Sequence, residues 1–86
     1  MNAPDDKLYL IYLRSPQETL RPREFEGLCQ LDDGLYLLRS RLSRSKVYHA
    51  IKRAALPEGL LVAPLEDGPK FKGMKEGALK WLRANR

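Results

Sequence analysis

Two blocks of basic residues are the part of this sequence whose composition best suits chemistry with a partner. Residues 34–57 carry six basic residues and no acid, and residues 69–86 carry six basic residues and one acid, Glu76. Lysine and arginine neutralise phosphates, and charge gathered in blocks indicates a polyanionic partner better than the net charge of +5 alone. The candidate nucleic-acid contacts are Arg39, Arg41, Arg44, Lys46, Lys52, Arg53, Lys70, Phe71 and Lys72. A solvated surface, with Phe71 in the core, is the competing interpretation.

Catalytic and metal-binding groups are sparse. His49 is the only histidine and Cys29 the only cysteine, so neither has a partner of its own kind for a ligand pair. The pairs Asp32/Asp33 and Glu66/Asp67 each precede a glycine, which turn chemistry explains. We therefore predict no catalytic residue, no metal site and no cofactor. A metal-dependent nuclease that uses Asp32/Asp33 across a dimer axis stays open as the third alternative.

The length of 86 residues predicts one domain over residues 1–86, with residues 1–6 as a disordered tail. The apolar stretches are too short to cross a bilayer, and the first residues lack the features of a signal peptide. A single cysteine excludes an internal disulfide. We expect a cytoplasmic protein without a membrane partner.

The first elements are a strand and a short helix. In "KLYLIYL" (Lys7–Leu13) both faces are apolar, which predicts a central strand covered on both sides. "SPQE" (Ser15–Glu18) has the pattern of a helix start, but Pro22 interrupts it. The helix therefore spans either 16–21 or 22–30, and the sequence does not separate these.

The following segments predict a hairpin, a helix, a strand and a last helix. Asp33-Gly34 suits a tight turn between strands near Gly27–Leu31 and over Leu35–Leu42, with Arg39 and Arg41 on one face. Ser43 is expected to cap a helix over residues 44–56 whose apolar stripe is Val47, Tyr48, Ile51, Ala54 and Ala55. Lys46, His49, Lys52 and Arg53 then face solvent. A buried strand over Gly59–Leu65, near an edge because of Pro64, and an amphipathic helix over Met74–Ala84 complete the chain.

This order predicts an α+β fold of the ferredoxin-like β-α-β-β-α-β class, with a short first helix and an extra C-terminal helix. Helices in that class cover one face of the sheet, whereas the first strand is apolar on both faces. The second face must be covered either by the C-terminal helix or by another copy of the chain. We favour a homodimer.

The segments "LYLIYL", "GLYLLRS", "LSRSKVYHAIKRAAL", "LLVAPL" and "GALKWL" cover most of the chain. Their arrangement resembles the small ferredoxin-like CRISPR integration subunits, the second Cas protein, and their stand-alone relatives. The resemblance implies a homodimer whose basic edges hold nucleic acid. It also implies an acidic metal ligand at the end of the first strand, where this chain has Arg14 and Ser15. Nuclease activity therefore does not carry over.

The sequence as a whole favours a small non-catalytic protein that binds nucleic acid or a nucleoprotein. Whether the nucleic acid is DNA or RNA stays open. A homodimeric protein–protein interaction module is the alternative.

Overall fold

The computed structural model describes residues 6–84. The predicted tail lies outside this range over residues 1–5, and its last residue, Asp6, is partly buried. The elements are β1 (Lys7–Arg14), β2 (Leu28–Asp32), β3 (Leu35–Ser40), α1 (Arg44–Ala55), β4 (Gly59–Leu65) and α2 (Ala78–Ala84). They form a small α+β fold with one four-stranded antiparallel sheet. None of the described helices combines the length and apolar character that a membrane span requires.

The strand order in the sheet is β2-β3-β1-β4, so β1 is central and β4 lies at an edge. Both positions confirm the sequence predictions: β1 is apolar on its two faces, and Pro64 occupies an edge strand where its missing N–H is tolerated. The register places Leu65 opposite Leu8 and Leu61 opposite Tyr12. The end of β4 therefore lies beside the start of β1.

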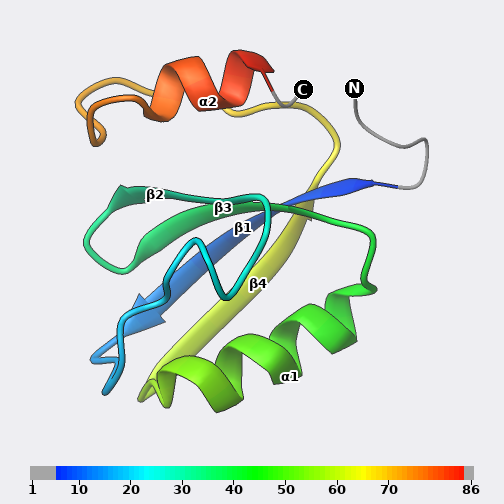
Figure 1. Ribbon diagram of the computed structural model, residues 1–86, viewed down its shortest axis with the longest axis vertical. Helices are drawn as coiled ribbons and strands as arrows, with labels where there is room; N and C mark the ends of the chain where they lie inside the picture. The colour runs from blue at the N-terminus through cyan, green and yellow to red at the C-terminus, as the bar shows by residue number, and fades with distance from the viewer. Residues whose placement is uncertain (1–5, 85–86) are drawn as a thin grey trace.

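Each face of the sheet has its own hydrophobic cluster and its own helix. On one face, Tyr9, Ile11 and Leu13 of β1 pack with residues of α1. On the other face, Leu8 packs in a cluster with Leu82 of α2. Figure 1 shows α1 and α2 on opposite sides of the sheet. The C-terminal helix thus covers part of the second face within a single chain.

The predicted first helix is wrong in both of its versions. Residues 15–27, all of which the structure describes, form turns and irregular chain. Ser15 has a φ of 50°, outside the extended range that a capping residue adopts. Pro22 and a Gly27 with φ of 83° further oppose a continuous helix. The segment is anchored instead by the buried side chain of Leu20.

The predicted burial of the strand over Gly59–Leu65 is wrong, because every residue of β4 is partly or fully exposed at this edge position. The remaining elements form as predicted, with shifted boundaries. Gly34 has the positive φ, 71°, that the predicted hairpin turn requires. Strand β3 ends at Ser40 rather than Leu42, and Leu42 is exposed. Helix α2 begins at Ala78 rather than Met74, directly after Gly77, whose φ of 87° is not helical. The predicted amphipathic pattern is present in α2, where Ala78 and Leu82 are buried, but the helix begins only after Gly77.

Candidate nucleic-acid interface

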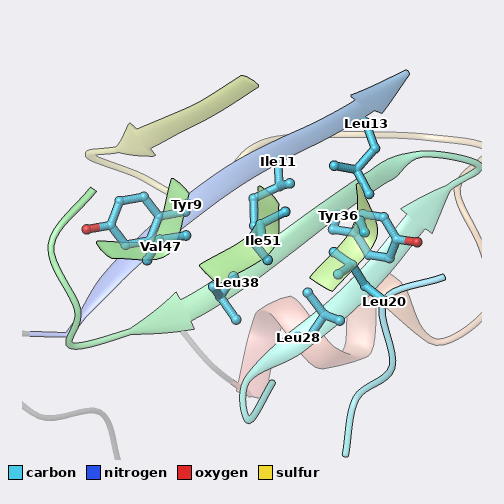
Figure 2. Close-up of a cluster of buried hydrophobic side chains, with 10 residues drawn as sticks. Tyr9, Ile11, Leu13, Leu20, Leu28, Tyr36, Leu38, Val47 and Ile51 are labelled. Carbon is cyan, nitrogen blue, oxygen red and sulfur yellow. The ribbon is translucent and has the colours of Figure 1, made fainter. Parts of the chain in front are cut away.

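Helix α1 buries one side against the sheet and presents the other to solvent. Val47, Ile51 and Ala55 are its buried residues. Figure 2 shows Val47 and Ile51 among the side chains of β1 and β3. Residues three or four apart lie on one side of a helix, so Lys46 and Arg53 point away from the buried side, whereas Arg44, three residues before Val47, is exposed in the first turn. The exposed cations of α1 are Arg44, Lys46, Lys52 and Arg53, as the sequence predicted.

The two ends of α1 are fixed by backbone hydrogen bonds. At the first turn, the Ser43 hydroxyl accepts a hydrogen bond of 3.3 Å from the Lys46 N–H, which confirms the predicted N-cap. At the last turn, Leu56 adopts a left-handed conformation and donates to the Lys52 carbonyl. The Gln17 and Glu18 N–H groups donate to the Ala55 carbonyl at 2.9 and 3.1 Å. The loop that replaces the first predicted helix therefore secures the end of α1.

The helix dipole explains only half of the charge on α1. Lys52 and Arg53 lie in the last turn, where cations are stabilised by the negative end of the dipole. Arg44 and Lys46 lie in the first turn, which contains no acid. Cations there oppose the positive end of the dipole, so helix stability does not account for them.

The structure separates Arg39 from the α1 cations. Arg39 is the register partner of Leu8, so its side chain belongs to the face that α2 covers. It is also partly buried. Arg41 lies beyond the end of β3, is exposed, and forms a salt bridge with Asp6 at 3.5 Å. Arg39 and Arg41 were predicted to share a face of one strand. They do not, because the strand ends before Arg41.

A hollow of about 900 Å³ adjoins both arginines, and its lining has mixed charge. Asp6, Glu24 and Glu26 line it together with Arg39 and Arg41. The stretch from residue 34 to 57 is free of acids in sequence, but folding brings acids from two other segments next to its first part. The uniformly basic character is retained on α1.

The second predicted group lies away from α1. Phe71 is partly buried and packs against the cluster that includes Leu82 of α2, so its packing accounts for an aromatic residue at this position. Lys70 and Lys72 are exposed. These two lysines belong to the segment between β4 and α2 and do not share the α1 surface.

Tyr48 was assigned to the apolar stripe of the helix, and this assignment is wrong. Its side chain is 36% exposed. The Tyr48 and His49 rings make an edge-to-face contact, with centroids 5.1 Å apart and an interplanar angle of 84°. The spacing of the buried residues, 47, 51 and 55, could have revealed this, because Tyr48 is one position out of phase with it.

The remaining titratable groups have structural surroundings. Cys29 is a partly buried free thiol, and burial raises its pKa. The Asp32 carboxylate accepts a hydrogen bond of 2.9 Å from the Asp33 N–H, as turn chemistry predicts. Leu35 pairs with Tyr12 and Leu65 with Leu8, so the turn at Asp32/Asp33 and the loop after β4 lie at opposite ends of the sheet. Within residues 6–84, three or more His, Cys, Asp or Glu side chains nowhere gather as a metal site would require.

Comparison with known proteins gives no relative. No family model, no curated protein and no solved structure matches the chain significantly.

Proposed function

We propose that this chain is a small non-catalytic nucleic-acid-binding protein that contacts phosphates through the exposed cations of α1. The observation that carries the proposal is the pair Arg44 and Lys46 in the first turn of that helix. Together with Lys52 and Arg53 they give a helix of twelve residues whose exposed charges are all positive. Such a surface binds a polyanion through phosphate neutralisation and counterion release.

Position 46 supports the proposal most directly. Ser43 is the N-cap, and Lys46 is the third residue after it. A glutamate at that position would complete a capping box with Ser43 and would also favour the helix dipole. The chain has a lysine instead, which costs helix stability. A need for positive charge on this surface explains the choice.

The test is the binding of labelled single- and double-stranded DNA and RNA at two salt concentrations. We compare the parent protein with Lys46→Glu and with Lys80→Glu as a matched control, because Lys80 is an exposed lysine on α2, across the sheet. Weaker binding by Lys46→Glu alone supports the proposal. Equal binding by all three proteins contradicts it.

A homodimer is the second candidate, favoured by the cross-strand pair Tyr12 and Leu61. These register partners are 43% and 50% exposed on the face that α2 covers only in part. Leu61 belongs to the edge strand β4, which carries no charged residue from Gly59 to Leu65. Two copies related by a twofold axis would bury this pair without opposing like charges. Light scattering after gel filtration tests this candidate. A dimeric parent protein together with a monomeric Leu61→Lys variant supports the dimer, and a monomeric parent protein excludes it.

The finer fold class and the family relationship are also proposals. The order β2-β3-β1-β4 with antiparallel neighbours supports a ferredoxin-like sheet in which a loop replaces the first helix. A relationship to the second Cas protein rests on the same elements and on the basic helix. A cytoplasmic location is proposed from the single unpaired cysteine.

A further inference from the structure

An exposed aromatic pair lies within the basic surface of α1. Tyr48 follows Arg44 by four residues and precedes Lys52 by four, so both cations neighbour its ring on the helix surface. Its ring contacts the ring of His49 edge-to-face. This contact restrains the orientation of the two rings, so less side-chain entropy is lost if one of them stacks on a ligand. The surface therefore combines aromatic faces with phosphate-binding charges.

This combination of side chains suits single-stranded better than double-stranded nucleic acid. In a duplex the bases are paired and stacked on each other, so a surface tyrosine meets only the backbone. In a single strand the faces of the bases are free to stack on aromatic side chains while cations neutralise the phosphates. Arg44 and Lys52 alone would favour any polyanion, and Tyr48 adds a preference among polyanions.

We infer that α1 binds single-stranded nucleic acid, with a base stacked on Tyr48 and the flanking phosphates on Arg44 and Lys52. The inference rests on the proposed function and specifies its substrate class. It assigns a binding role to Tyr48, whose side chain is only partly used in the core. Tyr48 is 36% exposed, whereas Val47 and Ile51, the neighbouring apolar residues of α1, are 1% and 0% exposed.

The experiment measures fluorescence anisotropy with a labelled oligothymidylate, a labelled oligouridylate and a labelled DNA duplex of the same length. The variants are Tyr48→Phe, which keeps an aromatic face, and Tyr48→Leu, which keeps apolar bulk without one. We expect Tyr48→Leu to weaken single-strand binding by about 5- to 100-fold and Tyr48→Phe by about twofold or less. Duplex affinity should be the same for all three proteins. Melting temperatures measured in parallel show that each variant is folded.

The possible results distinguish a failure of the single-strand inference from a failure of the proposed nucleic-acid binding. A parent protein that prefers the duplex, or a Tyr48→Leu variant that binds single strands like Tyr48→Phe, overturns the inference alone, provided that Lys46→Glu still weakens binding. Equal losses by Tyr48→Leu on single strands and duplex also overturn it, because stacking would not affect the duplex. If the parent binds none of the three probes, the proposed function fails as well.

Discussion

The Tyr9 hydroxyl donates a hydrogen bond of 2.7 Å to the carbonyl oxygen of Leu42. Tyr9 belongs to the central strand and its side chain is fully buried, whereas Leu42 lies in the short connection between β3 and α1. The bond joins residues 33 positions apart. It therefore fixes the chain just before the Ser43 cap, and with it the position of the basic first turn of α1.

Tyr9→Phe removes this bond and keeps the ring. We expect a loss of about 0.5–1.5 kcal/mol in the free energy of unfolding, measured by urea denaturation, because a single net hydrogen bond is lost and the exposed Leu42 backbone can be solvated. Nucleic-acid affinity should also fall slightly if the first turn becomes less well positioned. A variant as stable as the parent would show that the bond is not formed in solution.

Lys46→Glu should change stability and binding in opposite directions. The free energy of unfolding is expected to rise by about 0.5–1 kcal/mol, since the substitution completes a capping box and places an acid near the positive end of the dipole. Binding should weaken, and the slope of log affinity against log salt should become shallower by about 1. Thermal melts and salt titrations on the same samples check both. Higher stability with unchanged affinity would make Lys46 an ordinary surface residue.

Gly34→Ala should be strongly destabilising. A Cβ at Gly34 would contact the Leu13 carbonyl oxygen, and the φ of 71° is unfavourable for alanine. The left-handed conformation costs about 1–2 kcal/mol, and displacing a strand carbonyl adds a cost, so we expect a total of roughly 3 kcal/mol or more.

Gly73→Ala is the matched control for that substitution. Gly73 has a similar φ of 78°, but a Cβ there meets nothing within 4 Å. It should cost only the conformational part, about 1–2 kcal/mol. Equal losses of stability in the two variants would mean that the close approach of Gly34 to the Leu13 carbonyl does not add to the cost of Gly34→Ala.

Stability should decrease in alkaline solution. Burial raises the pKa of both Tyr9 and Tyr36 above the ordinary tyrosine value. The folded state therefore holds these protons more tightly than the unfolded state. Their contribution is complete below the unfolded pKa, about 10, and is lost as the pH rises through the folded pKa. Urea denaturation across this range should show a steeper loss for the parent than for a Tyr9→Phe/Tyr36→Phe variant, and parallel curves would refute the assignment.

Cys29 should react slowly with iodoacetamide. Burial raises the pKa of its thiol, so less thiolate is present at neutral pH than in a free cysteine, and access is restricted as well. The alkylation rate should be lower for the folded protein than for the protein in denaturant. The rise of this rate with pH should also occur at a higher pH in the folded protein than in the denatured protein. A faster reaction in the folded state would indicate an activated nucleophile.

The sequence predicted those features that depend on neighbouring residues. Short apolar runs identified the strands, Asp33-Gly34 identified the hairpin turn, and Ser43 identified the start of α1. The first helix was predicted wrongly because Ser15–Glu18 satisfies a local pattern while the chain turns at Ser15 and donates from Gln17 and Glu18 to the end of α1. These two hydrogen bonds join segments that are far apart in the sequence, so no local sequence pattern predicts them.

The candidate site shows the same division. The exposure of Lys46, Lys52 and Arg53 follows from helical periodicity, and Arg44 precedes them in the first turn of the same helix. The acids beside Arg39 and Arg41 come from residues 6, 24 and 26, so only folding reveals that this part of the basic stretch is not free of negative charge. The prediction that Tyr48 is buried was wrong because this residue lies at the margin of the apolar stripe, where a difference of one position decides burial.

The central position of β1 also determines when the sheet can form during synthesis. β1 pairs only with β3 and β4 among the strands described, and its partners in β4 begin at Gly59, 45 residues after its last residue, Arg14. Of these four strands, the first to be synthesised is thus the last to gain both neighbours. Until β4 is made, one edge of β1 stays unpaired even if β3 has already joined it, so we expect this segment to be prone to aggregation and its pairing with β4 to slow folding.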